Sequence, residues 1–221
     1  MDGIPMSNAS GPVYRIIPSR YPKIDLYERV SSSAEWELLH EIESLTNPRL
    51  RDEIGDIKLV PEADRIFGEG ASLVMAAFTH PPVDGRGGRF NRDFGIYYCS
   101  PHEQVCVAET LHHQGRFLRE SRVVAETVQM RVIIAQLGPV QLHDIRKVWD
   151  AALYSPDSYV AGQALGASLK AAGSYGLRYR SVRTSPGECI AVMRPSALQQ
   201  ARHLRYLQYH YDNGQIRAEP R

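Results

Sequence analysis

One short stretch of the chain predicts a loop, a strand and a helix in succession, and the helix contains a charged side chain. This combination restricts the fold. Residues 87–109 read GGRFNRDFGIYYCSPHEQVCVAE. The glycines predict a loop, the aromatic residues predict a strand, and Ser100-Pro101 predicts the start of a helix. Glu109 lies in VCVAETL, whose neighbouring residues are apolar or small. An ionised carboxylate there is costly unless it is paired or used, so Glu109 needs a partner.

Size and charge narrow the class of protein. The chain has 221 residues, 43% of them apolar, which is enough for one large domain with a substantial core. The formal net charge of +1 gives no overall attraction to nucleic acid or to a membrane surface. No apolar run approaches the ~20 residues that span a bilayer, and residues 1–12 lack the features of a secretion signal. We expect those twelve residues to form a frayed tail.

The cysteines indicate a reducing compartment. Cys99, Cys106 and Cys189 are odd in number, form no CxxC pair and lie among apolar neighbours. Free thiols in such places behave as small hydrophobic groups. We therefore expect a cytoplasmic protein without disulfides.

Runs of β-branched and aromatic residues predict the strands. They lie at residues 13–17, 57–60, 94–99 and 128–137, followed by a hairpin of residues 176–182 and 188–193. A terminal hairpin is expected over residues 206–216, with Asn213-Gly214 at its turn.

A period of 3.6 residues predicts the helices. They cover about residues 36–45, ended by Asn47-Pro48, residues 101–113, and residues 156–172. Residues 72–78 fit either a strand or a short helix. Because strands and helices mix without a regular βαβ rhythm, we predict an α+β fold with a mixed β-sheet core and flanking helices.

Common cofactor and metal motifs are incomplete. Gly68 and Gly70 begin a GxGxxG pattern that has Leu73 in place of the third glycine, and no P-loop is present. His40-Glu41 begins an HExxH zinc motif that ends in Ser44 instead of histidine. We therefore expect chemistry without a metal, or plain binding.

Several side chains able to carry chemistry remain, and their order resembles a known family. Their flanking segments read VYRI, GGRFN, IYYCSPHEQVCVAE, GLRYRSVR and ECIAVMRP between residues 13 and 195. In these segments the chain resembles the RES-domain toxins of bacterial toxin–antitoxin pairs, which are named for an Arg, a Glu and a Ser. The matching residues are Arg15, Arg89, Tyr98, Glu109 and Ser181, and the neighbouring Gly88 and Tyr97 are further candidates for binding NAD.

The resemblance implies an enzyme similar in fold to ADP-ribosyltransferases that acts on NAD. Members degrade NAD by hydrolysis or phosphorolysis, or transfer its ADP-ribose to a protein. Arg15, Glu109 and Ser181 would be the named catalytic residues, and Tyr98, eleven residues before Glu109, the family tyrosine. About seventy residues separate Arg15 from the glycine-rich loop, so we expect a RES domain over residues 13–221 with an insertion at about 19–82. Such a longer form favours transfer to a protein.

Each of these residue types suits the chemistry of NAD. A carboxylate stabilises the positive charge that develops on the ribose when nicotinamide leaves. The aromatic ring of Tyr98 could stack on nicotinamide. Arg89 beside Gly88 offers a guanidinium and backbone N–H groups to the pyrophosphate. Ser181 could donate a hydrogen bond to the nicotinamide amide or to the ribose.

Plainer interpretations stay open. Glu109 could form a structural salt bridge with Arg89 or Arg116. The aromatic residues 206–211 and the charged insertion could make the chain a non-catalytic interaction protein. For a toxin, the resemblance implies an Xre-type helix-turn-helix antitoxin as partner, with DNA bound only through that antitoxin.

Overall fold

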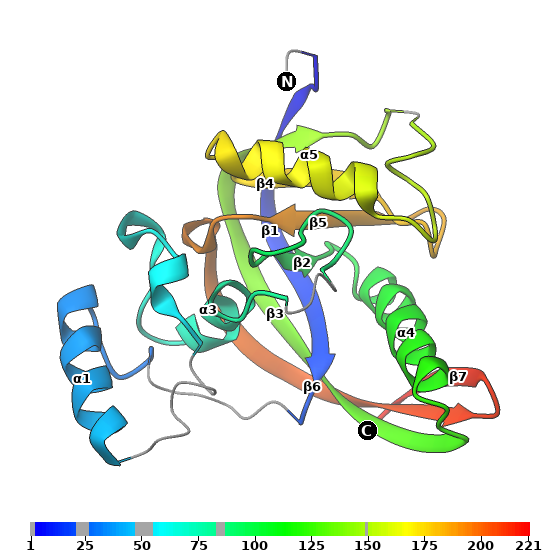
Figure 1. Cartoon of the computed structure of the whole chain (residues 1–221), viewed down its shortest axis with the longest axis horizontal. Helices are drawn as coiled ribbons and strands as arrows, with labels where there is room; N and C mark the ends of the chain where they lie inside the picture. Colours follow the sequence, from blue (N-terminus) through cyan, green and yellow to red (C-terminus); the bar gives the residue numbers. More distant parts are fainter. Residues whose placement is uncertain (1–2, 21–26, 47–54, 83–86, 149) are drawn as a thin grey trace.

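The computed structural model describes residues 3–20, 27–46, 55–82, 87–148 and 150–221 (Figure 1). Seven strands form one sheet in the order β2-β5-β4-β3-β6-β7, and β1 pairs with β3 off this path. The strands are β1 (Met6–Pro18), β2 (Tyr97–Cys99), β3 (Ala125–Asp144), β4 (Gly176–Arg180), β5 (Glu188–Val192), β6 (Leu198–Asp212) and β7 (Gln215–Pro220).

The helices connect these strands. The α-helices are α1 (Ser33–Thr46), α3 (Ala71–Thr79), α4 (Glu103–Glu120) and α5 (Val160–Ala171), and the 3₁₀ turns are η1 (Ile57–Leu59), η2 (Glu62–Asp64) and η3 (Pro195–Ala197). Within the described ranges, each helix is too short or too polar to cross a lipid bilayer.

Strand β3 organises the sheet. It pairs antiparallel with β1 from Met130 to His143 and antiparallel with β6 from Ala125 to Leu137. Its last two residues pair parallel with β4. The alternating apolar residues at its centre favour this long strand, because buried β-branched side chains fit a pleated sheet. The predicted single-domain α+β fold with a mixed sheet and flanking helices is confirmed.

The first strand begins earlier than the sequence indicated. We expected residues 1–12 to be frayed, but β1 starts at Met6, which lies opposite His143 of β3. The Ser, Asn, Gly and Pro residues of this part have weak strand preferences. The exposed edge of β3 supplies their hydrogen-bond partners, with a bulge between Ala9 and Gly11. Residues 1–2 lie outside the described ranges.

Other boundaries also differ. The strand expected at residues 57–60 is the 3₁₀ turn η1, which Asp56 caps by accepting a hydrogen bond from the Lys58 N–H. Residues 72–78 belong to helix α3, which settles the alternative. Helix α4 starts after His102, two residues later than the Ser100 cap predicts, and extends to Glu120.

The other predicted strands and helices have the expected type but different lengths in the structure. The strand predicted at residues 94–99 is only β2, the strand predicted at 128–137 lengthens to β3, and helix α5 starts at Val160 rather than near residue 156. Both predicted hairpins are confirmed, as β4–β5 and β6–β7. The predicted helix end at Asn47-Pro48 lies outside the described residues.

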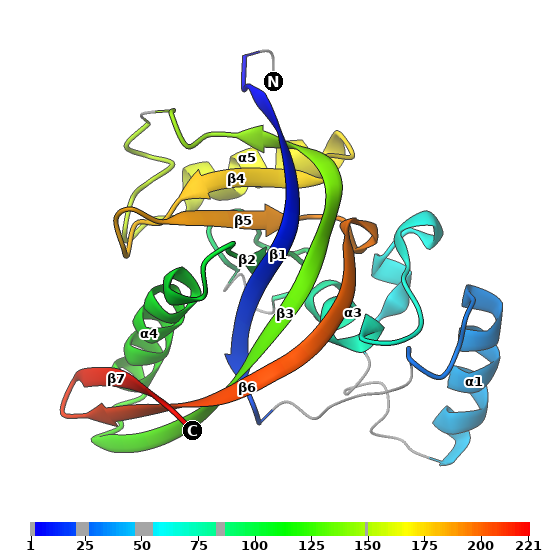
Figure 2. The ribbon, with the colours of Figure 1, turned by 180° about the vertical axis from the view of Figure 1, so that it is seen from behind.

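Three buried apolar clusters hold the layers together. One packs α1 and α3 against β1 and β3, the second packs α5 against β4 and β5, and the third packs α4 against β3 and β6. Figure 2 shows the long strands β1, β3 and β6 in front, with α3, α4 and α5 behind them. The helices therefore surround one face of the sheet, and the region where their clusters meet is available for a site.

Two glycines on α5 let the glycine-rich loop lie directly against that helix. A Cβ at Gly162 would be 2.3 Å from the Arg89 carbonyl oxygen, and one at Gly166 would be 1.8 Å from that of Phe90. Real Cβ atoms do not approach so closely, so any side chain there would push the loop away. The spacing of four residues places both glycines on one face of the helix.

We expect Gly166→Ala to lower the free energy of unfolding by about 1–3 kcal/mol, because the added methyl group overpacks this contact. Chemical denaturation would measure the change. Gly138→Ala is the matched control, since a Cβ there meets no atom closer than 3.6 Å, and it should change stability by less than about 0.5 kcal/mol. Equal stabilities for the two variants would contradict the close contact.

Candidate functional site

A cavity of about 170 Å³ lies where the three apolar clusters meet. Its wall takes Cys99 from the first cluster, Tyr179 and Cys189 from the second, and Ile16 and Cys106 from the third. Five residues predicted from the sequence also line it, and these are Arg15, Gly88, Arg89, Tyr98 and Glu109. Segments far apart in the sequence therefore meet around one partly apolar space.

Glu109 is half-buried on α4 and has a hydroxyl partner. Its Oε1 accepts a hydrogen bond of 2.6 Å from Ser181 Oγ. Within the described ranges Glu109 forms no ion pair within 4.0 Å, and Arg116, one of the partners considered above, instead pairs with Glu120 at 2.7 Å. The carboxylate is thus oriented without being neutralised by a salt bridge.

Ser181 is fixed by the turn that follows β4. Its Oγ accepts the backbone N–H groups of Arg183 at 3.0 Å and Thr184 at 3.2 Å while it donates to Glu109. A hydroxyl has a single proton to donate. In this arrangement Ser181 therefore holds Glu109 in place and has no proton left for a hydrogen bond to a ligand.

Arg15 reaches the cavity from β1 and rests on the two adjacent tyrosines of β2. Its Nη1 donates to the Tyr98 carbonyl oxygen at 3.1 Å, and its guanidinium lies 4.8 Å from the centre of the Tyr97 ring. A cation over an aromatic face is stabilised by the ring quadrupole. Tyr97 is fully buried and is not part of the cavity wall, so it supports Arg15 from behind.

The Tyr98 hydroxyl holds the glycine-rich loop. It accepts the Phe90 N–H at 2.9 Å and donates to Asn91 Oδ1 at 2.7 Å, and Asn91 Oδ1 also accepts the Gly88 N–H at 2.9 Å. A Cβ on Gly88 would lie 2.7 Å from that hydroxyl. Burial raises the pKa of Tyr98 above its usual range, so the phenol keeps the proton that it donates to Asn91.

Arg89 forms hydrogen bonds to a second loop, residues 150–159, and holds it beside the cavity. Its side chain is 8% exposed, and Nη1 donates to the carbonyl oxygens of Leu153 at 2.9 Å and Ser155 at 2.8 Å. Its guanidinium lies 4.8 Å from the ring of Tyr159, which lines the cavity too. Arg183 adds a bond of 2.7 Å to the Pro156 carbonyl oxygen. Arg89 thus uses part of its hydrogen-bonding capacity within the protein.

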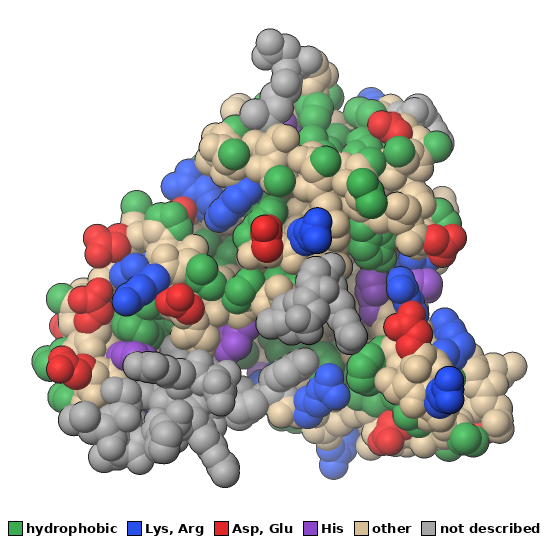
Figure 3. Space-filling view, in the orientation of Figure 1, with side chains coloured by type: hydrophobic (Ala, Val, Ile, Leu, Met, Phe, Trp, Pro, Cys, Tyr) green, Lys and Arg blue, Asp and Glu red, His purple; other side chains and the backbone are tan. Residues whose placement is uncertain are grey.

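His113 lies one helical turn after Glu109 and also lines the cavity. Desolvation, followed by the guanidinium groups of Arg183, Arg116 and Arg89, lowers the pKa of His113. His113 is exposed to solvent, and its lowered pKa leaves the imidazole neutral at pH 7. Figure 3 shows histidine and arginine or lysine side chains together on this side, between α5 and α4.

Sequence analysis missed several residues of the site. Asn91 holds the loop, Thr110 shares a hydrogen bond of 2.7 Å with the Tyr209 hydroxyl, and Tyr159 stacks on Arg89. The spacing of four residues from Glu109 was a signal for His113. The thiols of Cys99, Cys106 and Cys189 line the wall, and burial raises the pKa of each above its ordinary value.

Residues 62–212 match the RES domain family. The chain belongs to the RES-domain family. The match covers more than half of the chain and confirms the resemblance seen in its motifs. Arg89, Tyr98, Glu109 and Ser181 lie within the matched residues, whereas Arg15 precedes them. The match begins inside the segment taken as an insertion, residues 19–82, so that boundary stays a prediction.

Two further similarities accompany this RES domain. The uncharacterized protein y4oC of Sinorhizobium fredii (strain NBRC 101917 / NGR234) is 28% identical over 202 residues, which cover 90% of this chain and 81% of that protein. A chain in the crystal structure of the M. tuberculosis MbcT–MbcA toxin–antitoxin complex is 14% identical, with a TM-score of 0.47. That similarity covers 90% of this chain and 86% of the other.

The described residues of the site include no cluster of side chains that could hold a metal ion. Among the described residues, no three His, Cys, Asp or Glu side chains are arranged to hold an ion. The site instead offers one oriented carboxylate, two guanidinium groups and an apolar wall.

We expect Arg183→Ala to raise the pKa of His113 toward the usual histidine value, because a nearby positive charge that disfavours imidazolium is removed. NMR titration of the histidine ring protons would measure this. Arg119→Ala, an exposed arginine on the same helix, is the control and should leave the His113 pKa unchanged. An unchanged His113 pKa in Arg183→Ala would contradict the influence of this guanidinium on the imidazole.

Proposed function

We propose that this RES-domain protein is the toxin of a toxin–antitoxin pair and that it consumes NAD⁺, most simply by transferring ADP-ribose to a cellular protein. The observation that carries the proposal is the hydrogen bond between Glu109 and Ser181 beside a cavity that also contains Arg15, Arg89 and Tyr98. The family's named Arg, Glu and Ser are therefore close together although they are far apart in the sequence.

The cavity suits one end of NAD. At about 170 Å³ it is smaller than the ~300–1,000 Å³ of pockets for whole drug-sized ligands. We infer that it takes the nicotinamide and the adjoining ribose, with the apolar wall and the Tyr98 ring against the pyridine ring. The pyrophosphate would then extend to the mouth, where Arg183 and Arg116 add positive charge beside His113.

Glu109 is the catalytic residue in this proposal. When the bond between ribose C1′ and the nicotinamide nitrogen breaks, its electron pair leaves with nicotinamide and positive charge develops on the ribose. A carboxylate that is not neutralised by a salt bridge stabilises this charge, more strongly in a partly apolar cavity than in water. It also accepts the proton of the group that attacks C1′.

The other residues position groups for this step. Ser181 orients the carboxylate rather than donating to NAD, because its proton is already used. Arg15, held on Tyr97, presents a cation to the inner part of the substrate. Arg89 keeps the loop of residues 150–159 in place and also adds charge, so we assign it a mixed structural and phosphate-binding role. Gly88 and Tyr98 keep the loop that carries Arg89 in its shape.

Two points extend beyond the geometry of the site. Degradation of NAD by water or phosphate needs the same carboxylate and is the alternative to transfer. The family resemblance supports an antitoxin partner of the Xre helix-turn-helix type. With a net charge of +1, the chain itself has no electrostatic reason to bind DNA.

We expect Glu109→Gln to lower the release of nicotinamide from NAD by about 10²–10⁴-fold, because the amide neither stabilises the ribose cation nor accepts a proton. Chromatography of nicotinamide would measure the rate, and thermal unfolding would check that the variant folds. The control is Glu120→Gln, which removes an exposed carboxylate from the same helix and should retain the rate.

In cells, expression of the native chain should arrest growth and Glu109→Gln should relieve the arrest. Undiminished toxicity from a folded Glu109→Gln protein would refute the enzymatic proposal. Labelled NAD separates its two forms, since label on a protein band indicates transfer and label only in small products indicates degradation.

A further inference from the structure

A second and larger depression lies next to the cavity. This groove has a volume of about 660 Å³ and runs between the first turn of α4 and the turn that joins β4 to β5. The residues that define it are His102, Gln104, Tyr154, Arg180, Ser181 and Thr184. Hydroxyl, amide, imidazole and guanidinium groups on its walls can donate and accept hydrogen bonds.

A hydrogen bond between two side chains joins the walls of the two spaces. Glu109 lines the cavity, Ser181 lines the groove, and 2.6 Å separates their oxygen atoms. Strands β4 and β5 also contribute to both spaces. Tyr179 and Cys189 line the cavity, and the residues next to them in the sequence, Arg180 and Glu188, line the groove. A group bound in the groove would therefore lie next to the Ser181–Glu109 pair, at the border between the groove and the cavity.

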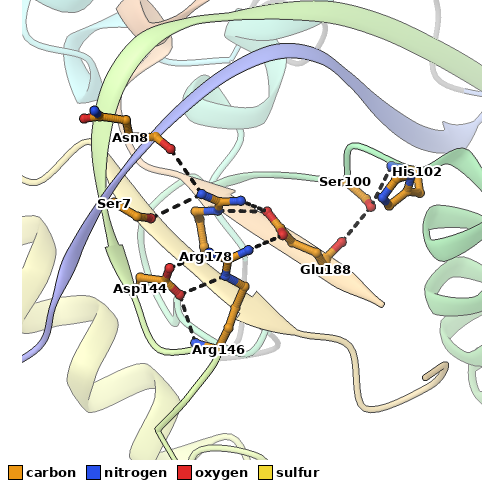
Figure 4. A network of polar contacts seen from close by, with 8 residues as sticks. All are labelled: Ser7, Asn8, Ser100, His102, Asp144, Arg146, Arg178 and Glu188. Carbon is orange, nitrogen blue, oxygen red and sulfur yellow. Dashed lines mark hydrogen bonds and ion pairs between the residues drawn. The ribbon is translucent and has the colours of Figure 1, made fainter. Parts of the chain in front are cut away.

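The floor of the groove is rigid and its acidic group is neutralised. Figure 4 shows Glu188 held by Arg146 and Arg178, with ion pairs of 2.6 and 2.7 Å. The Ser100 hydroxyl donates to the Glu188 carbonyl oxygen at 2.6 Å, which ties β5 to the segment before α4. These contacts fix the two walls relative to each other and leave no unpaired carboxylate to repel an acidic partner.

We propose that the groove binds the acceptor of ADP-ribose and that this acceptor is a polypeptide segment. The inference rests on the proposed function. Water or phosphate needs no binding site of this size, whereas a segment of several residues does. Backbone amides and polar side chains of such a segment match the mixed donors and acceptors of the walls. The groove directs one side chain of the segment to the Ser181–Glu109 pair.

In the transfer step, Glu109 of this pair takes up the proton that the acceptor loses. The acceptor's nucleophile bonds to ribose C1′ as the bond to the nicotinamide nitrogen breaks. That bonding pair leaves with nicotinamide, whose ring nitrogen becomes neutral. The nucleophile gives its proton to the Glu109 carboxylate, which Ser181 holds in position through the existing hydrogen bond. Glu109 ends the step protonated and returns the proton to solvent.

The test fills the groove without touching the cavity. Gln104 is exposed in the first turn of α4 and is not part of the cavity wall, so Gln104→Trp narrows the groove. The full-length protein is incubated with adenine-labelled NAD and a bacterial lysate, and protein-bound label and released nicotinamide are both measured. We expect the protein-bound label to fall about tenfold, while NAD raises the unfolding temperature of the variant as much as that of the native chain, as expected when binding of one substrate alone is lost.

Gln141→Trp is the matched control, because Gln141 is an exposed glutamine of β3 outside both walls, and it should keep the native level of protein-bound label. Undiminished protein-bound label in folded Gln104→Trp overturns the groove as acceptor site, and so does a loss of label that is accompanied by loss of the stabilisation by NAD. Nicotinamide release with no protein label in the native chain overturns it too, while the proposed NAD chemistry stands. A native chain that releases no nicotinamide refutes the proposed function itself.

Discussion

The backbone pairing of one 20-residue strand, β3, is the constraint on which the site depends. Because β1 pairs along one edge of β3 while β6 and β4 pair along the other, residues from the beginning and the end of the chain are held at fixed positions. β1 brings Arg15 to the tyrosines of β2, and β4 ends in the turn that contains Ser181. Helix α4 packs on β3 and β6, and it places Glu109 beside Ser181 and on the same cavity wall as Arg15.

Much of this fold could be predicted from local patterns, and the exceptions have physical reasons. Buried β-branched runs and the Asn213-Gly214 turn indicate strands and hairpins through preferences that act within a few residues. The start of β1 has no such signal, since its pairing with β3 overrides weak preferences. The 3₁₀ turn at Ile57 also depends on a local cap, Asp56, which an apolar pattern does not reveal.

For the candidate site, the sequence predicted which residues come together but not the contacts that they make. The sequence indicated Arg15, Arg89, Tyr98 and Glu109 as neighbours, because their order and flanks resemble a family. It did not indicate what they contact. The partners of Arg89 are backbone carbonyl oxygens, which belong to every residue type, and the Ser181 proton goes to a carboxylate 72 positions away. Such pairings follow from the tertiary structure alone.

The long separation within the Glu109–Ser181 pair has a consequence for synthesis of the chain. Glu109 leaves the ribosome 72 residues before Ser181, an interval of roughly 4–15 s at ~5–20 residues per second. Strand β6, which completes the pairing of β3, follows later still. A nascent chain therefore carries this acidic side chain without the hydroxyl that orients it until β4 and the turn after it have been made.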